Sequence, residues 1–430
     1  MLKTLTRRVV ARVAARHVRK HGIDLSRLDV IPDDGKAALT RDGTDTKPEL
    51  SRLRAEGPMH RIDLPFPFDA YLITGHAEAR EILTARDLYS NDIRHLFHGD
   101  GPATKDDIGG LGFTDPPIHT RLRKIITPEF TMRRLARLEP LIHDIADRAL
   151  DELAESPAPD FAKLVAFPIP FNTICALLGI DNEERERFAA LGTARFDATG
   201  GAAAAFGAVS AQREFIHETV RKQRIEPGPG LLGQIIRDEG DAIDDWELTG
   251  LADGVFTGGF ETTAGMIALG TLVLMRDPDH VAMVTSGDRK QLDAVVEELL
   301  RYLSVVQVAF PRFVKEDMEL FGHRIRKGDV LLSSLAAANR DPEVAGEQPD
   351  AFDPLRIPSS GHLAFGHGMH RCIGAELARM ELRIVLPKIF ERFPDLALAV
   401  DESDLEFRQM SFVFGLDSMP VDLSPVAARA

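Results

Sequence analysis

One cysteine of this chain lies in a glycine-rich segment that leaves the backbone few ways to fold around it. Residues 365–374 read FGHGMHRCIG, with Cys372 near the end. Glycines permit tight turns and let a flat ligand approach the backbone, because they carry no Cβ. The next eight residues are rich in helix formers, so we expect Cys372 just before a helix N-terminus. Free N–H groups and the helix dipole favour a thiolate there, and the competing interpretation is a structural cysteine beside a turn.

This segment resembles the haem-binding loop of the cytochrome P450 family. The family pattern Phe-Gly-x-Gly-x-His-x-Cys-x-Gly is met at every fixed position. The resemblance implies a haem b cofactor whose iron is bound by Cys372 as a thiolate. It also implies that other residues of the loop contact the haem, namely Phe365, Gly366, His370 and Gly374.

The rest of the chain predicts a mainly α fold with small β-sheets (α+β). Hydrophobic residues make up 44% of the 430 residues, which is typical of a globular protein with a sizeable interior. Helical periodicity dominates from 77 to 300, and residues 320–325 and 330–334 predict a hairpin around a Lys-Gly turn. The resemblance implies a single triangular P450 haem domain over 45–430, preceded by an extension over 1–44.

The extension is basic, in contrast to the whole chain, whose formal net charge is −15. Every charged residue from Lys3 to Lys20 is Lys or Arg, and apolar residues lie between them. This pattern predicts an amphipathic helix, which would suit an anionic membrane surface or an acidic partner. We favour a solvated helix packed on the body, and no apolar run here resembles a signal peptide.

The net charge and the cysteine content limit the classes of partner and the cellular compartment that we expect. A net charge of −15 argues against binding nucleic acid, because phosphate contacts need a basic surface. Only Cys175 and Cys372 occur, and Cys175 lies in an apolar stretch that predicts a helix core. A disulfide framework is therefore not expected, which favours a reducing cytoplasm.

A long predicted helix over 245–276 carries the sequence GGFETT in its middle. Two adjacent glycines, Gly258 and Gly259, weaken a helix by roughly 1 kcal/mol each, so we expect them to allow close approach of a ligand. Glu261 and Thr262 together suggest a proton relay, and a packing notch is the alternative. The segment resembles the family's oxygen-activation motif. That resemblance implies that Thr262 and Glu261 are the catalytic pair delivering protons, and that the glycines contact the cofactor.

Two further groups of charged residues fall where the family has them. Glu298 and Arg301 are three residues apart and share a helix face. The resemblance implies that they form a structural network with Arg356. It also implies that four residues bind the haem propionates, namely His119, Arg123, Arg312 and His370.

These resemblances together imply a haem-thiolate monooxygenase that hydroxylates a hydrophobic small molecule with O2 and two electrons. No flavin or nicotinamide fingerprint occurs, so the electrons are expected from a separate ferredoxin and an NAD(P)H-dependent ferredoxin reductase. We expect a basic docking patch for this donor, formed by Arg121, Lys124, Arg371 and Arg379.

Two alternatives remain at this point. One is a peroxide-driven peroxygenase, although such relatives generally lack the acid–alcohol pair. The other is a non-catalytic haem-bearing partner protein, although such members usually lose part of the haem loop, which is complete here.

The substrate pocket is expected to be apolar, since the segments that line it by resemblance are rich in Phe and aliphatic residues. They include residues 89–113 and 196–206. The individual residues that we expect to line it are Val255, Phe260, Val305, Val308 and Val413.

Overall fold

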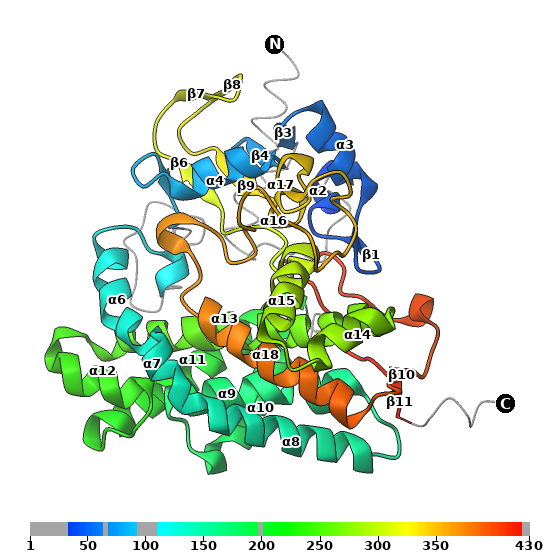
Figure 1. Cartoon of the computed structure of the whole chain (residues 1–430). Helices are drawn as coiled ribbons and strands as arrows, with labels where there is room; N and C mark the ends of the chain where they lie inside the picture. Colours follow the sequence, from blue (N-terminus) through cyan, green and yellow to red (C-terminus); the bar gives the residue numbers. More distant parts are fainter. Residues whose placement is uncertain (1–32, 63–67, 93–109, 197–200, 424–430) are drawn as a thin grey trace.

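Helices form most of the body, and the five-stranded sheet and the β7–β8 pair lie at one corner, toward which the outline tapers, whereas β10 and β11 lie at the far end (Figure 1). The computed structural model describes residues 33–62, 68–92, 110–196 and 201–423. Within this part of the chain no helix is long and apolar enough to cross a membrane. The prediction of a mainly α fold with small sheets is confirmed.

Helices and strands are named as in Figure 1. The α-helices are α2 (Asp33–Ala37), α3 (Pro48–Glu56), α4 (His76–Thr84), α6 (Ile118–Ile126), α7 (Met132–Leu135), α8 (Glu139–Glu155), α9 (Pro168–Leu178), α10 (Asn182–Phe196), α11 (Gly201–Ile225), α12 (Leu231–Glu239), α13 (Asp245–Leu274), α14 (Pro278–Thr285), α15 (Arg289–Leu303), α16 (Leu335–Ala338), α17 (Pro342–Ala345) and α18 (Ala375–Arg392). The strands are β1 (Arg41–Asp42), β2 (Asp45–Thr46), β3 (Met59–Ile62), β4 (Ala70–Ile73), β5 (Tyr89–Ser90), β6 (Arg312–Val314), β7 (Met318–Leu320), β8 (His323–Ile325), β9 (Val330–Ser333), β10 (Ala397–Leu398) and β11 (Val421–Asp422).

The largest sheet has five strands in the order β3-β4-β9-β6-β5. Its β4–β9 pair is parallel and its other pairs are antiparallel. The hairpin expected between residues 320–325 and 330–334 is wrong. The hairpin in the structure pairs β7 with β8, and its turn is formed by Phe321 and Gly322, both at positive φ. Gly328 instead lies in the connection from β8 to β9, which belongs to the five-stranded sheet.

The long predicted helix is present as α13, which crosses the middle of the body (Figure 1). Asp244 caps it, because its carboxylate accepts a hydrogen bond from the Glu247 amide at 2.8 Å. The Glu247 carboxylate accepts in return from the Asp244 amide at 3.3 Å, which completes a capping box. Most of α13 is buried on all sides, so its stability comes mainly from packing.

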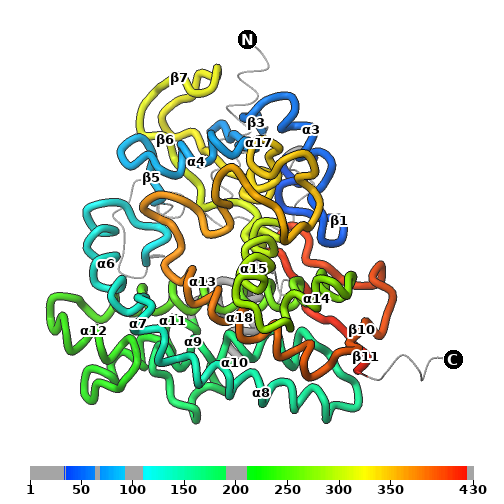
Figure 2. The backbone as a smooth tube through the Cα atoms, viewed as in Figure 1, coloured from blue at the N-terminus to red at the C-terminus, as the bar shows by residue number. Residues whose placement is uncertain are grey.

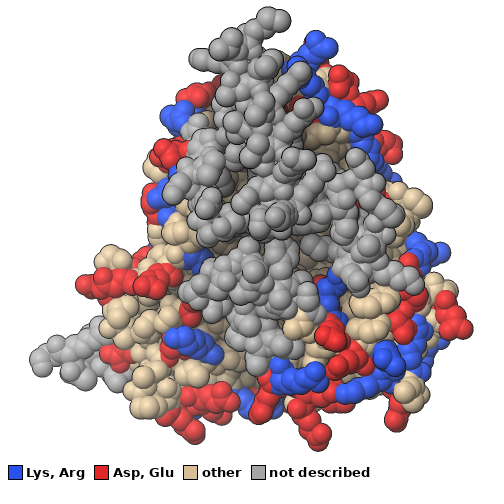
Figure 3. Space-filling model, turned by 180° about the vertical axis from the view of Figure 1, so that it is seen from behind, with Lys and Arg blue, Asp and Glu red and all other residues tan. Residues whose placement is uncertain are grey.

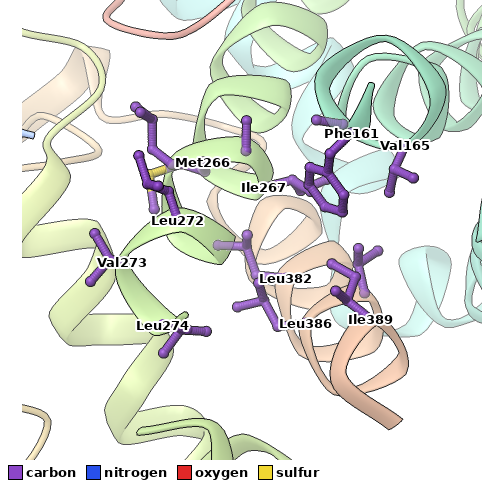
Figure 4. Packing of buried hydrophobic residues seen from close by; sticks show 14 of the residues in the cluster. Phe161, Val165, Met266, Ile267, Leu272, Val273, Leu274, Leu382, Leu386 and Ile389 are labelled. Atoms are coloured by element: carbon purple, nitrogen blue, oxygen red, sulfur yellow. The ribbon is translucent and has the colours of Figure 1, made fainter. Parts of the chain in front are cut away.

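The core fixes α13 relative to α18, the helix that begins after Cys372 (Figure 4). Ile267 and Leu272 of α13 pack in the same cluster as Leu382 and Leu386 of α18. Phe161 joins them just before a π-helical turn. Fully burying one such side chain contributes about 1.5–3 kcal/mol. The cluster therefore holds the helix of the GGFETT segment and the helix of the cysteine loop in one arrangement.

Residues 33–46 pack against this same body. Arg41 of β1 is buried, and the Tyr302 hydroxyl donates to Asp45 at 2.9 Å. The expected boundary between residues 44 and 45 thus falls inside the β1–β2 hairpin. The basic helix expected between residues 3 and 20 lies outside the described residues.

Candidate active site

The glycine-rich segment folds into a tight loop that ends where α18 begins. The Cys372 amide donates to the Phe365 carbonyl at 2.8 Å, which closes the loop. Gly366 and Gly368 have φ of +66° and +70°, in the region that favours glycine. A Cβ on Gly368 would lie 2.2 Å from the Leu83 carbonyl oxygen, so no other residue fits there.

The environment of Cys372 contains opposing influences on its thiol. Burial raises the pKa of the thiol, whereas the Gly374 amide and the charges of Arg123, Arg371 and Arg379 favour the thiolate. The helix N-terminus alone thus does not make the thiolate the favoured form, because burial outweighs it. Cys372 is nevertheless only half-buried by its exposed surface, although many protein atoms surround its sulfur. A metal cation bound to the sulfur would supply the missing stabilisation of the thiolate.

Three of the four expected propionate ligands form a buried group with few hydrogen-bond partners among the described residues. The rings of His119 and His370 lie with their centroids 4.3 Å apart. Their ring nitrogens, and Nε and NH1 of Arg312, are buried without a hydrogen bond of normal geometry to any described residue. Burial, together with the neighbouring cation Arg312, lowers the pKa of His370 to about 3, and burial lowers the pKa of Arg312 to about 10.

Arg123, the fourth expected propionate ligand, interacts electrostatically with both Cys372 and His119. Burial lowers its pKa, the thiol of Cys372 raises it, and its charge in turn lowers the pKa of His119. Buried donors without acceptors are costly, so this group calls for a bound anion with several oxygens. The two propionates of haem would satisfy that requirement, and Cys372 would bind its iron. The residues of the site therefore fit haem.

One face of α13 is open at the middle of the GGFETT segment. A Cβ on Gly258 would meet no atom within 4 Å, so open space lies beside it. The Thr262 hydroxyl donates to the Gly258 carbonyl at 2.7 Å and is only partly buried. The expectation for Gly259 needs correction, because a Cβ there would lie 2.5 Å from the Ile174 side chain of α9. Gly259 is a packing contact between helices, whereas Gly258 faces the open side.

Glu261 has a partner that the sequence did not reveal. Its carboxylate pairs with the guanidinium of Arg408. Arg408 also donates from Nε to Asp417 at 2.6 Å and lies 5.6 Å over the ring of Phe167. Asp417 is exposed, whereas Glu261 is buried. A line of charged groups thus leads from the acid of the expected catalytic pair to the surface. Arg408 is 147 residues from Glu261, so no local motif could reveal it.

The expected structural network is brought together by the fold. Arg301 donates from Nε and NH2 to both carboxylate oxygens of Glu298, each at 2.7 Å. Arg356 donates to the same carboxylate at 3.2 Å. Both guanidiniums also donate to the Ala351 carbonyl, at 2.8 and 2.9 Å. The network joins α15 to the segment that precedes the cysteine loop.

Two expected pocket residues lie in the core instead. Phe260 packs among Phe167, Phe171 and Phe256 with ring centroids 5.6–6.0 Å apart, behind α13. Val308 is buried under the five-stranded sheet in the cluster that includes Ala37, Leu50 and Leu72. Both expectations need correction. For Phe260 the reason is that α13 is apolar nearly all round, so its pattern did not show which side faces the ligand. Val308 lies beyond α15, where it bridges Ser334 and packs against residues of the first 72 positions.

The other residues expected to line the pocket differ in how far they are buried. Val255 and Val305 are buried, and Val413 is partly buried where it bridges Val306. Phe310 and Phe412 are instead half-exposed, at 49% and 52%. Residues 93–109, and the side chains of residues 190–210, lie outside the described part of the chain.

The expected docking patch is reduced by ion pairs. Arg121 pairs with Glu247 across to α13. Arg379 is largely buried and donates to Glu297 at 2.5 Å and to Glu376 at 3.0 Å. Lys124 and Arg371 are exposed and make no ion pair with any described residue. On the face turned away from the viewer in Figure 1, which Figure 3 shows, basic and acidic side chains are interspersed.

Comparison with known proteins gives one consistent family. The family model described as Cytochrome P450 matches residues 210–418. Cytochrome P450 165B3 of Amycolatopsis orientalis is 35% identical over 392 residues, covering 89% of this chain and 97% of that relative. Cytochrome P450 monooxygenase PikC of Streptomyces venezuelae is 37% identical, covering 89% and 92%. The crystal structure of OxyC, described as implicated in an oxidative C–C coupling reaction during vancomycin biosynthesis, superposes with a TM-score of 0.80 at 34% identity, covering 91% and 97%.

Proposed function

The chain belongs to the cytochrome P450 family, and from this premise we propose that it hydroxylates a hydrophobic small molecule with electrons from a separate ferredoxin and its reductase. The resemblance of the cysteine loop to this family is thereby confirmed. The chain is a cytochrome P450 monooxygenase with haem b as its cofactor.

The observation that carries the proposal is the buried group of His119, Arg312 and His370, whose ring nitrogens and two guanidinium nitrogens find no hydrogen-bond partner of normal geometry among the described residues. The half-buried Cys372 follows His370 by two residues. We propose that these side chains and Arg123 hold the propionates, and that Cys372 binds the iron. When bound, haem supplies the activation of dioxygen. The protein contributes the anchoring charges, the apolar surroundings and the protons.

We propose that Thr262 and Glu261 move those protons. Thr262 presents its hydroxyl at the open face of α13, next to Gly258. Glu261 is the neighbouring acid, and Arg408 links it to the exposed Asp417. In this arrangement Arg408 holds the carboxylate of Glu261 in place between turnovers, and solvent protons enter along the same line of charged groups.

The thiolate is tested by replacing each cysteine separately. Cys372→Ser should abolish the thiolate-type carbon monoxide difference spectrum and the hydroxylation. Cys175→Ser is the control, because Cys175 is buried in α9 and burial raises the pKa of its thiol to about 12. A Cys372→Ser protein that keeps the thiolate-type spectrum would refute the assignment.

We propose that the electron donor docks beside Lys124 and Arg371, the exposed cations of the expected patch. Charge reversal of either one should slow ferredoxin-driven reduction, and the wild-type rate should fall as salt rises, because exposed charges are screened. Lys327→Glu, in the connection between β8 and β9, is the matched control. Reduction by dithionite should be equal in all variants. Equal ferredoxin-driven rates in all variants would mean that the donor docks elsewhere.

A second candidate activity is oxidative C–C coupling of an aromatic substrate. Phe310 and Phe412 present half-exposed rings, and Phe113 meets Phe310 edge to face at 4.8 Å, which suits an aromatic substrate. OxyC, a relative at 34% identity, is described as implicated in an oxidative C–C coupling reaction. Product analysis under labelled dioxygen separates the two activities, since hydroxylation places a labelled oxygen atom in the product and coupling does not.

We also place the protein in a reducing compartment, the cytoplasm. Both cysteines are free thiols, and the site needs Cys372 to remain available as a ligand.

A further inference from the structure

Arg41, in the short strand β1, is a buried cation that the proposed chemistry does not use. Its side chain is 3% exposed and forms no ion pair with a described carboxylate. Burial, followed by the nearby charge of Arg340, lowers its pKa to about 9. A buried charge is costly unless it is well hydrogen-bonded, so the contacts of Arg41 show what its position requires.

Those contacts join two segments that are distant in sequence. One is the segment 303–308, which follows α15, and the other is the loop 409–414. Nε of Arg41 donates to the Gln307 side-chain oxygen at 2.7 Å, and NH2 donates to a backbone carbonyl at the end of α15 at 2.9 Å. The guanidinium lies 4.9 Å over the ring of Phe414. The chain beside β1 runs next to the C-terminal segment in Figure 2.

Gln307 extends the connection from Arg41 into the loop 409–414. Its side-chain nitrogen donates to the Ser411 carbonyl at 2.7 Å, and its amide donates to the Phe412 carbonyl at 3.0 Å. The Phe414 amide donates to the Val305 carbonyl at 2.7 Å. The two segments are thus held together by their backbones, with Gln307 between them and Arg41 behind it.

The backbone of β1 contacts the same loop directly. The Arg41 amide donates to the side-chain oxygen of Gln409 at 3.2 Å, and the Gln409 side-chain nitrogen donates back to the Arg41 carbonyl at 3.3 Å. The Ser411 amide donates to the Leu39 carbonyl at 3.3 Å. Leu39 and Arg41 therefore make three hydrogen bonds to the loop 409–414.

These two segments carry residues of the expected substrate pocket. Phe412, in the loop 409–414, and Phe310, two residues beyond the other segment, have half-exposed rings. The loop also rests on α13, since a Cβ on Gly265 would lie 2.9 Å from the Phe414 carbonyl oxygen. Gly265 follows Thr262 by three residues, about one helical turn. A shift of the loop would therefore move Phe412 relative to the open face of α13.

We infer that Arg41 is a positioning residue for substrate recognition, which sets the pocket wall by clamping the segment 303–308 to the loop 409–414. The inference rests on the proposed function, because it assigns the open face of α13 and these two segments to the substrate. Arg41 acts through Gln307 and the backbone of the loop, not by touching the substrate. The N-terminal hairpin thereby determines which ligands fit.

The test compares a small and a bulky nitrogen ligand of the haem iron. Imidazole and 4-phenylimidazole are titrated into haem-loaded wild type, Arg41→Met and Arg41→Lys, and binding is followed by the shift of the Soret band. Arg41→Met should weaken 4-phenylimidazole about tenfold, equivalent to about 1.4 kcal/mol, and leave imidazole within about twofold. Arg41→Lys keeps the charge and one donor, so its loss should be smaller. Gln307→Ala should match Arg41→Met, and the double variant should add little, because the two residues act in one network.

Arg340→Met is the matched control. Arg340 is also a buried arginine, lying 4.5 Å over the ring of Tyr302, but it donates to neither Gln307 nor the loop 409–414. The measured quantity is the ratio of the affinities for 4-phenylimidazole and imidazole. If Arg340→Met changes this ratio as much as Arg41→Met does, Arg41 has only a structural role and the inference is overturned.

Hydrogen exchange decides the same question without haem. The amides of Gln307 and Phe414 bond across the two segments, so they should exchange faster in Arg41→Met than in Arg340→Met. Equal exchange in the two variants would overturn the inference. A wild type that shows no haem spectrum would refute the proposed function, and the exchange measurement would still decide the role of Arg41.

Discussion

Replacing the buried carboxylic acid of Glu381 by an amide should remove most of the pH dependence of stability near neutral pH. Glu381 lies on α18 with 1% of its surface exposed. Its Oε2 is buried without a hydrogen bond to any residue that the structure describes. Burial raises the pKa of the carboxyl from 4.5 to about 8, so the folded protein keeps this group protonated at neutral pH.

The sign and the magnitude follow from proton linkage. Between pH 4.5 and about 8, the folded protein holds a proton that the unfolded chain has released, so stability falls as pH rises. The contribution is fully present below pH 4.5 and is lost as pH rises through the folded pKa of about 8. At about 1.36 kcal/mol per pH unit, the step from about pH 6.5 to about pH 8 lowers the free energy of unfolding by roughly 2 kcal/mol.

The assay is urea unfolding followed by far-ultraviolet circular dichroism at these two pH values. Wild type should lose stability at the higher pH, whereas Glu381→Gln should change little, because an amide does not titrate. Glu391→Gln, an exposed carboxyl on the same helix, is the control and should behave as wild type. Equal losses in wild type and Glu381→Gln would show that the buried acid does not titrate in this range.

Three further changes test the site. Gly368→Ala should reduce haem content per protein several-fold, because the new Cβ would lie 2.2 Å from a backbone carbonyl of α4, whereas Gly361→Ala meets no atom within 4 Å and should load normally. Arg408→Gln should lower the free energy of unfolding by about 3 kcal/mol, because it removes the guanidinium beside the buried carboxylate of Glu261. Adding Glu261→Gln should restore part of it, and an Arg408→Gln protein as stable as wild type would contradict the pairing. Thr262→Ala should keep haem but divert electrons to hydrogen peroxide, and coupling equal to wild type would remove Thr262 from the relay.

The sequence by itself determined the features that depend on order along one short segment. The glycines around Cys372 required a tight loop before a helix, and the loop has that form. Glu298 and Arg301 are three residues apart on one helix, so their pairing follows from helical geometry alone. The helix expected over 245–276 is present as α13, Asp245–Leu274, so its extent followed from the pattern of one segment.

Only the tertiary structure decided which groups meet across the fold and which side of α13 faces the ligand. Arg408 reaches Glu261 from 147 residues away, and Arg379, expected at the surface, is held by Glu297. Phe260 lies in the core because a helix that is apolar nearly all round does not show in its pattern which face is open. Partners of buried charges are set by how helices and loops pack, and the periodicity of one segment contains no information about the others.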